Sequence, residues 1–346
     1  ILHYDFQNVE NNVIKDVSGK GNEGTIKGTG ATVEDGVLTL PGGNAGSSAA
    51  YVELPTGMFD GQDTLTISLW MQNKTEKGNY TGMFFGSSDG QDYWLLNPCN
   101  PAGKMKSVFT NTKSSSPYNN EYGISPTKAA QGIDGPDTDS EWGMYTTVIT
   151  PDAIEAYYNG QYVGKVNKTR TVSDFGSNLI AYLGKSTYND IFYKGSIKEL
   201  KVYTGALTQE EVTSEYAQEK IRESAKALGI TEGKTVKDLT LPTSGTNGIT
   251  ITWKSDKPEY ISETGKVTRP QAGAGNQKVT LTATISIGDV SKEYTYNMIV
   301  PEDTDAENKT YLEELTEKFV PEWKYLWEDT KLPAQYEGME LTWKTD

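Results

Sequence analysis

Residues 65–71 read Leu-Thr-Ile-Ser-Leu-Trp-Met, with an apolar side chain at every second position. This period of two predicts a β-strand with one buried face. Residues 154–158 alternate in the same way and lead into Asn159-Gly160, a pair that favours a two-residue hairpin turn. Residues 179–183 repeat the pattern, and no long segment of helical period interrupts residues 1–203. We therefore predict an all-β antiparallel sandwich for this part of the chain.

A helical pattern begins after this region. Thr208-Gln209-Glu210-Glu211 has the spacing of a capping box, in which Thr208 caps the helix and Glu211 reaches back to it. Apolar residues then recur at helical spacing up to Leu228, and Gly229 follows as a stop signal. The sequence predicts a helix over 208–228.

Alternation resumes beyond the helix. Residues 249–253, 279–287 and 294–300 each place apolar side chains at every second position. The short length of this region and its few strands predict a small immunoglobulin-like sandwich. We expect four parts in the chain: a sandwich at 1–207, a connecting helix at 208–228, an immunoglobulin-like domain at 229–301, and a helix with a truncated second repeat at 302–346.

The last of these parts is predicted from an internal repeat. Thr252-Trp253-Lys254 is echoed by Thr342-Trp343-Lys344, and Leu241-Pro242 is echoed by Leu332-Pro333. The second copy stops soon after its first strand. We expect the chain to be a fragment of a longer polypeptide.

Composition excludes several classes of function. The chain has 346 residues, a formal net charge of −15, one histidine and one cysteine. The negative charge disfavours nucleic acid and anionic membrane surfaces as partners. A single histidine and a single cysteine leave no room for a histidine- or cysteine-based zinc site or an internal disulfide. No apolar run is long enough for a membrane span.

The first 216 residues resemble the concanavalin A-like laminin G superfamily, in its bacterial branch associated with glycan-degrading enzymes. The segments that carry the resemblance are His3–Phe6, Asp16–Gly24, Tyr51–Pro55, Leu65–Trp70, Gly195–Tyr203, Ala206–Thr208 and Glu211–Val212. The resemblance implies a concanavalin A-like β-sandwich of the jelly-roll type.

Residues 217–300 and their partial copy resemble the atrophied bacterial immunoglobulin-like domain. That domain accompanies the laminin G-like one in glycoside hydrolases directed at arabinan and arabinose. The resemblance implies an enzyme neighbourhood and does not by itself imply an activity.

The same resemblance implies one structural Ca²⁺ beside the first and last strands. Carried over to this sequence, its hard-oxygen ligands are Asp5, Asp16, Asn22 and Glu199, supplemented by backbone carbonyls of the loop 19–24. This chain departs from the family at Lys198, where aspartate is usual. The Lys198 ammonium can instead form a salt link with these carboxylates and replace the ion, and both alternatives stay open. The alternation also slips near Lys198, which predicts a β-bulge there.

A sugar-binding site needs an exposed aromatic ring with polar groups at its edge. Tyr93 and Trp94, with Asp92 and Asn97, have this composition, and the following loop 97–105 belongs to the same segment. Adjacent residues of a strand point to opposite faces, so at most one of the two rings can form the platform. The polar insert 113–141, which carries Tyr118, is a candidate wall. A core strand at 93–96 is the alternative explanation.

No strand carries the Glu-x-Asp-x-x-Glu pattern of the sandwich-fold glucanases, so we assign no catalytic residues. The sequence predicts a non-catalytic carbohydrate-binding accessory region of a secreted bacterial glycoside hydrolase, directed at arabinose-containing glycans. Its partners would be a plant polysaccharide and a catalytic domain of the same polypeptide. We expect it outside the cell or at the surface of a Gram-positive bacterium. A structural brace and spacer for the catalytic domain, and a cell-surface adhesin, are the alternatives.

Overall fold

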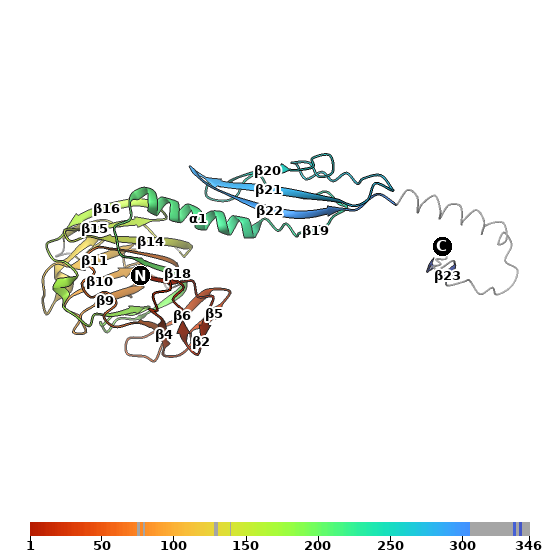
Figure 1. The fold of residues 1–346 in the computed structure, drawn as a ribbon. Helices are drawn as coiled ribbons and strands as arrows, with labels where there is room; N and C mark the ends of the chain where they lie inside the picture. Colours follow the sequence, from red (N-terminus) through yellow and green to blue (C-terminus); the bar gives the residue numbers. More distant parts are fainter. Residues whose placement is uncertain are drawn as a thin grey trace. The chain divides into compact units, whose positions relative to one another are not determined.

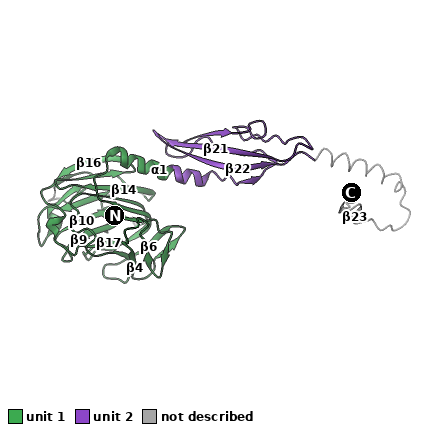
Figure 2. Ribbon diagram, in the orientation of Figure 1, with its two compact units in different colours: residues 1–220 green, residues 221–346 purple. Residues whose placement is uncertain are grey.

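The computed structural model describes residues 1–74, 77–78, 80–127, 131–138 and 140–304, together with the backbone of two short strands, β23 (Gln335–Tyr336) and β24 (Met339–Glu340). The chain divides into two compact units, residues 1–220 and 221–346 (Figure 2). The boundary falls inside helix α1 (Gln209–Ala227). Each half of this helix therefore belongs to a different unit.

Unit 1 is built from two layers of strands, as the alternating pattern predicts (Figure 1). The eight-stranded sheet contains, in spatial order, β16 (Gln161–Asn167), β15 (Ala153–Tyr158), β14 (Trp142–Ile149), β8 (Leu65–Asn73), β18 (Phe192–Tyr203), β6 (Val37–Gly43) and β5 (Thr32–Glu34), with β1 (Leu2–Tyr4) also paired to β18. The ten-stranded sheet contains β13 (Gln131–Ile133), β12 (Glu121–Ile124), β11 (Lys106–Thr110), β10 (Tyr93–Asn97), β9 (Met83–Gly86), β17 (Ile180–Leu183), β7 (Tyr51–Leu54), β4 (Gly24–Lys27), β3 (Val13–Ile14) and β2 (Val9–Glu10). Two 3₁₀ turns, η1 (Pro117–Asn120) and η2 (Ser173–Phe175), lie in the connections.

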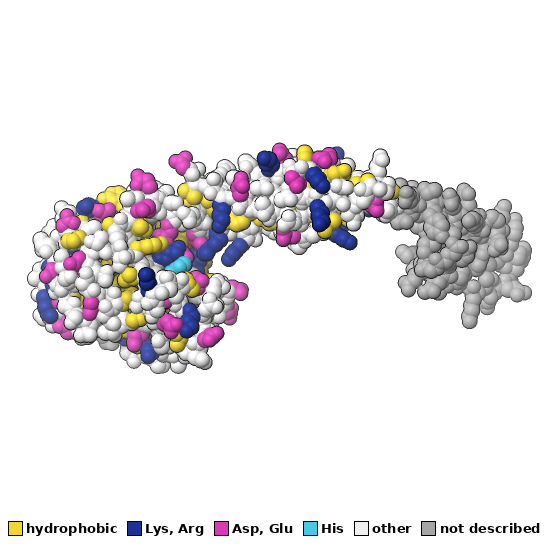
Figure 3. Space-filling view, viewed as in Figure 1, with side chains coloured by type: hydrophobic (Ala, Val, Ile, Leu, Met, Phe, Trp, Pro, Cys, Tyr) yellow, Lys and Arg dark blue, Asp and Glu magenta, His cyan; other side chains and the backbone are white. Residues whose placement is uncertain are grey.

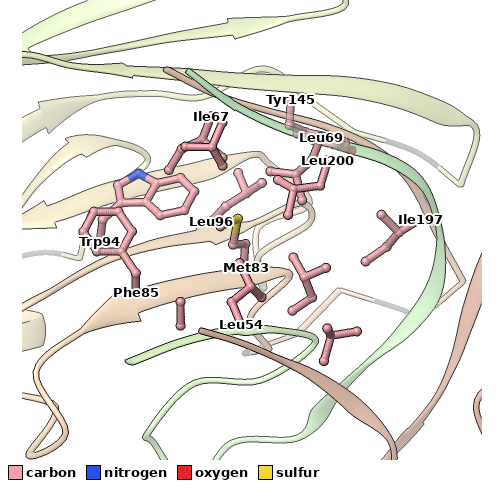
Figure 4. Close-up of a cluster of buried hydrophobic side chains, with 14 of the residues drawn as sticks. Leu54, Ile67, Leu69, Met83, Phe85, Trp94, Leu96, Tyr145, Ile197 and Leu200 are labelled. Carbon is pink, nitrogen blue, oxygen red and sulfur yellow. The ribbon is translucent and has the colours of Figure 1, made fainter. Parts of the chain in front are cut away.

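The core of unit 1 lies between these two sheets. Apolar side chains of both layers meet there, among them Leu69 and Leu200 from the eight-stranded sheet and Leu54, Phe85 and Leu96 from the ten-stranded sheet (Figure 4). Each such side chain contributes about 1.5–3 kcal/mol when fully buried. Burial of one face of each sheet therefore explains why period-two alternation dominates this part of the sequence.

Strand β8 differs from the prediction in one respect: it is buried on both faces. Its outward side chain Trp70 is 1% exposed and packs with Met144 of β14 and with Val212 and Tyr216 of α1. The Trp70 and Tyr216 rings are stacked, with centroids 5.5 Å apart. The first half of α1 therefore covers the outer face of the eight-stranded sheet, which alternation alone would leave in solvent.

The predicted hairpin and helix start are both confirmed. Asn159 and Gly160 join β15 to β16 with φ angles of 52° and 76°, the left-handed conformation that a tight hairpin turn requires. At the start of α1, the Thr208 amide donates to Glu211 Oε2 (2.7 Å) and the Glu211 amide donates to Thr208 Oγ1 (3.2 Å). These reciprocal bonds form the capping box that the sequence predicts.

The predicted bulge at Lys198 is also confirmed. Along β18, Ile197 pairs with Met71 of β8 and Glu199 pairs with Trp70, so Lys198 is the extra residue. Its ammonium lies 3.1 Å from Glu219 Oε1 of α1 and 4.2 Å from the centre of the Trp70 ring. The bulge therefore directs Lys198 toward α1.

Unit 2 contains, in its described part, one four-stranded sheet in the order β19 (Gly233–Lys234), β22 (Val290–Val300), β21 (Gln277–Ile287) and β20 (Thr250–Ser255). One face is apolar, with Val279, Leu281 and Ile285 in its core, and Ile221 from the second half of α1 packs into it. A helix and loops, rather than a second sheet, therefore cover this face in the described residues.

The helix and truncated repeat predicted at 302–346 lie almost entirely outside the described residues. Among the described residues, no helix has the length and apolar character needed to cross a membrane.

Candidate sugar-binding pocket

The candidate site lies on the outer face of the ten-stranded sheet. Trp94 and Leu96 of β10 point into the core, whereas Tyr93 and Leu95 belong to a separate cluster with Phe84 on the opposite face. The prediction that Tyr93 and Trp94 point to opposite faces is therefore confirmed.

Trp94 does not form a sugar-binding platform. Its side chain is 0% exposed and packs against Phe85, with ring centroids 5.6 Å apart (Figure 4). Its Nε1 donates to Ser107 Oγ at 3.1 Å. The prediction that Trp94 forms a platform is wrong, because both faces of its ring are buried in the core between the two sheets.

Tyr93 is fully buried as well, although it lies on the outer face. Its hydroxyl donates to Glu121 Oε1 at 2.8 Å, and Lys106 Nζ lies 2.7 Å from Glu121 Oε2. Burial and, after it, the Glu121 carboxylate raise the pKa of Tyr93. Tyr93 therefore holds the Glu121–Lys106 ion pair in place and has no exposed ring face for a sugar.

Asp92 is also enclosed, with an exposed fraction of 1%. Its carboxylate accepts a hydrogen bond from the Arg170 guanidinium and lies 3.6 Å from Lys113 Nζ. These contacts tie the loop before β10 to two other loops. In this structure the Asp92 carboxylate is therefore buried in ion pairs that hold loops together. This contradicts the prediction that it is a sugar ligand.

Asn97 does reach a pocket. A cavity of about 480 Å³ opens beside β10 and β11, and its lining residues are Tyr80, Thr81, Leu95, Asn97, Asn100, Pro101, Ala102, Lys106, Ser125, Pro126, Thr127 and Asp190. The Asn97 amide is itself occupied, because Nδ2 donates to Gly78 O (2.9 Å) and Oδ1 accepts from Cys99 N (3.0 Å). Asn97 therefore shapes the pocket wall.

Three other lining residues carry polar groups that no described protein atom satisfies. Thr81, Asn100 and Ser125 are 4%, 9% and 7% exposed. Among the described residues, the Thr81 and Ser125 hydroxyls and Asn100 Nδ2 have no hydrogen-bond partner, while Asn100 Oδ1 accepts from the amides of Ala102 and Lys104. These three groups are not among the described side-chain atoms that are sealed from solvent without a partner, so they open onto the pocket and can bond a polar ligand or water.

Two charged residues complete the lining. Lys106 faces Glu121 behind the pocket wall. Asp190 lies in the loop before β18 with its side chain exposed at the rim. Desolvation raises the pKa of Asp190, and the charge of Lys106 acts in the opposite direction.

Tyr118 is the one predicted aromatic residue whose ring is open to solvent, with an exposed fraction of 49%. Its carbonyl oxygen accepts a hydrogen bond from Thr127 Oγ1, and Thr127 lines the pocket. The exposed ring is therefore attached to the pocket wall through η1. Ser125, Pro126 and Thr127 are the residues of the 113–141 insert that line the pocket, and the role of Tyr118 stays a prediction.

Each of the four predicted calcium ligands has a protein partner in this structure. The Asp16 carboxylate accepts hydrogen bonds from the amides of His3 (3.0 Å), Ser18 (2.9 Å) and Asn22 (3.0 Å). Burial acts to raise the pKa of Asp16, but the hydrogen bonds, from Ser18 first, lower it overall. Asp16 therefore organises the 16–22 loop as an acceptor.

Asp5 and Asn22 are engaged in a similar way. Asp5 Oδ1 accepts from the Gln7 amide at 3.1 Å, and Asn22 Nδ2 donates to the carbonyl oxygen of Ile1 at 2.9 Å. Within the described residues, no group of three or more acidic, histidine or cysteine side chains is arranged to hold a metal ion. Asp5, Asp16 and Glu199 therefore do not form such a group, and a Ca²⁺ held with the help of Asn22 and backbone carbonyls stays a prediction.

Glu199 has partners that the sequence did not indicate. Its Oε1 lies 2.9 Å from His3 Nε2 and 3.1 Å from Lys201 Nζ. Burial acts to raise the pKa of Glu199, but the His3 hydrogen bond and the Lys201 charge lower it to about 2. Lys201 therefore occupies the place beside Glu199 that we predicted for Lys198, because the bulge turns Lys198 toward Glu219.

We expect Ca²⁺, added after chelation, to leave the Tm of unit 1 unchanged, since these carboxylates already have protein partners. Differential scanning calorimetry with and without Ca²⁺ measures this, because an ion that binds only the folded state raises Tm. A rise in Tm together with a heat of binding would contradict the expectation and return Asp5, Asp16, Asn22 and Glu199 to the role of ligands.

Comparison with known families agrees with the two units. A model of the concanavalin A-like lectin/glucanases superfamily matches residues 45–213, and a model of the atrophied bacterial Ig domain matches residues 221–303. Both families and their order are those indicated by the resemblance in the sequence. No curated protein matches the chain in sequence.

Solved structures are similar to this chain at low identity. Domain 4 of AbnA, an extracellular GH43 arabinanase from Geobacillus stearothermophilus solved in complex with arabinotriose, is 24% identical, with a TM-score of 0.48 over 61% of this chain and 95% of that one. The binding domain of botulinum neurotoxin serotype D/C is 13% identical, with a TM-score of 0.46 over 85% of this chain and 73% of that one. A Trypanosoma rangeli sialidase is 12% identical, with a TM-score of 0.48 over 64% of this chain and 32% of that one.

Proposed function

We propose that this chain, which carries a concanavalin A-like domain followed by an atrophied bacterial immunoglobulin-like domain, is a non-catalytic carbohydrate-binding accessory region of a secreted bacterial glycoside hydrolase. The sugar binds in the pocket beside β10 and β11. Arabinose-containing plant glycans are the proposed ligands. A catalytic domain of the same polypeptide gains from the high local concentration of substrate that such a module provides.

The observation that carries this proposal is the set of unsatisfied polar groups in the pocket. A saccharide presents many hydroxyls, each of which donates one hydrogen bond and accepts others. The hydroxyls of Thr81 and Ser125 and the amide nitrogen of Asn100 meet that need from three separate segments. The Tyr118 ring is exposed and its backbone is bonded to the lining residue Thr127, so we propose that it offers an apolar face for the C–H side of a sugar.

The carboxylates of the pocket favour binding over hydrolysis. Glycoside hydrolysis uses two carboxyl groups placed on either side of the scissile bond. Asp190 is the single carboxylate among the described lining residues. Glu121, behind the wall, is held by Lys106 and Tyr93. An acid–base pair is therefore not assembled from the described lining residues.

The charged surface is consistent with a neutral ligand. On the face of unit 1 in Figure 3, acidic and basic side chains are interspersed among uncharged atoms and do not gather into one patch of either sign. Association on that face would thus depend on hydrogen bonds and ring contacts more than on long-range attraction.

We expect the variant T81V/S125A to lose affinity for arabino-oligosaccharides by about tenfold or more, because each lost hydrogen bond costs about 0.5–1.5 kcal/mol. T81V replaces a hydroxyl by a methyl group of similar size, and S125A removes a hydroxyl and shortens the side chain by one atom. Isothermal titration calorimetry of the full chain with arabino-, xylo- and galacto-oligosaccharides measures the effect.

The matched control is T32V, which removes an exposed hydroxyl from β5 in the eight-stranded sheet. It should bind as the unmodified chain does. If no oligosaccharide binds the unmodified chain, the carbohydrate-binding function is wrong, and a structural brace becomes the better account.

A further inference from the structure

The charges of the pocket are not balanced. Lys106 Nζ forms an ion pair with Glu121 Oε2 at 2.7 Å, and the Glu121 side chain is 1% exposed. The other oxygen of Glu121 accepts a hydrogen bond from the Tyr93 hydroxyl, so this carboxylate is fixed in position. The ion pair leaves no net charge on this wall of the pocket.

Asp190 adds a negative charge that has no such partner. Among the described residues, its carboxylate has neither a hydrogen bond nor an ion pair. It lines the same cavity as Thr81, Asn100 and Ser125. The pocket therefore combines neutral donors and acceptors with one carboxylate that is not ion-paired, although the charge of Lys106 acts on it through space.

We infer that Asp190 makes the pocket selective for neutral saccharides over saccharides that contain uronic acids. This inference rests on the proposed sugar-binding function of the same pocket. The two oxygens of a carboxylate accept hydrogen bonds from neighbouring hydroxyls of one sugar ring, and such charge-assisted bonds are about twice as strong as neutral ones. A uronate carboxylate in the same place meets like charge, which is a repulsive element that discriminates between ligands.

The division of roles inside the pocket follows from this arrangement. The Asn100 amide donates to sugar oxygens, and the Thr81 and Ser125 hydroxyls donate or accept. These groups treat a neutral and an acidic sugar alike. Only Asp190, among the described lining residues, distinguishes the two by charge, because the charge of Lys106 is already met by Glu121.

The test is isothermal titration calorimetry of the full chain with two kinds of probe at low salt. The neutral probes are the trisaccharides of arabinose, xylose and galactose, and the acidic probe is trigalacturonate. The unmodified chain should bind at least one neutral probe and bind trigalacturonate at least tenfold more weakly. D190N should lower the affinity for the neutral probe by about tenfold or more, because hydrogen bonds to charged groups are stronger than those between neutral groups. It should also bring the affinities for the two kinds of probe closer together.

The control is D35N, which removes one negative charge from an exposed turn between β5 and β6. Asparagine tolerates the positive φ of 50° at this position, so the turn is kept. D35N should behave as the unmodified chain does, which separates the effect of Asp190 from that of net charge.

Two results would overturn the inference alone: equal binding of neutral and acidic probes by the unmodified chain, or unchanged affinities in D190N. In both cases the chain still binds sugar, so the proposed carbohydrate-binding function stands. Absence of binding to every probe overturns the proposed function and the inference together.

Discussion

Replacing Trp94 with alanine is expected to lower the free energy of unfolding of unit 1 by about 3–5 kcal/mol. The ring is fully enclosed between the sheets, and its removal leaves a cavity there. It also breaks a chain of hydrogen bonds, because Ser107 Oγ accepts from Trp94 Nε1 and lies 2.8 Å from Thr147 Oγ1 of the eight-stranded sheet. Urea denaturation followed by fluorescence and circular dichroism measures the loss.

The matched control is Y118A, since Tyr118 is the exposed aromatic residue of the same candidate site. It should change the free energy of unfolding by no more than about 0.5 kcal/mol, as surface substitutions usually do. It should weaken sugar binding. The reverse pattern, a stable W94A variant without sugar affinity and a Y118A variant with full affinity, would show that the assignment of the two rings is the wrong way round.

Acid is expected to destabilise unit 1 between about pH 4.5 and pH 2 through Glu199. The pKa of this carboxyl is about 2 in the folded protein, against 4.5 for the unperturbed group. Because the folded-state pKa is the lower one, the contribution is complete above pH 4.5 and is lost as the pH falls toward 2. Each pKa unit corresponds to about 1.4 kcal/mol, so the whole contribution is about 3 kcal/mol.

E199Q should remove this acid-dependent part of the stability curve and lower the stability near neutral pH. The free energy of unfolding is measured by urea denaturation at a series of pH values from 2 to 7. E34Q, at an exposed position of β5, serves as the control and should keep the pH dependence of the unmodified chain. An E199Q curve parallel to that of the unmodified chain would contradict the role of Glu199 in acid stability.

Local structure was predicted well where the signal is carried by neighbouring residues. The capping box at Thr208 and Glu211 and the turn at Asn159-Gly160 each depend on a few adjacent side chains and backbone angles. The bulge at Lys198 was visible as a slip in the period of apolar residues. These features need no distant partner, which is why their sequence pattern is sufficient.

The pocket could not be predicted in the same way. Thr81, Asn100, Ser125 and Asp190 come from segments up to 109 positions apart, and pairing of the strands brings these segments together. Two of the four lie in stretches that the sequence already singled out: Asn100 in the loop 97–105 of the candidate segment, and Ser125 in the candidate wall 113–141. Thr81 and Asp190 carry no local signal, since a threonine and an aspartate in a turn are common anywhere in a β-rich chain.

Which charged residues pair with one another depends on strand register and on the bulge, and the spacing of residues in the sequence does not show either. Lys198 and Lys201 both precede α1 on the same strand, and the bulge determines which of them reaches Glu199. Nothing in the sequence indicated a partner for His3, yet pairing of β1 with β18 places it beside Glu199. A shift of one residue in the strand exchanges the faces of all side chains that follow, so these contacts depend on register.

The sequence by itself determined the class of fold, the helix that follows the sandwich and the opposite orientations of Tyr93 and Trp94, because period and capping are properties of adjacent residues. Only the tertiary structure decided which of those two faces is the core, which aromatic ring stays exposed, and which polar groups meet in a pocket. These outcomes depend on what the second sheet and the loops cover. Alternation distinguishes two faces of a strand, and packing against other layers decides which face is buried.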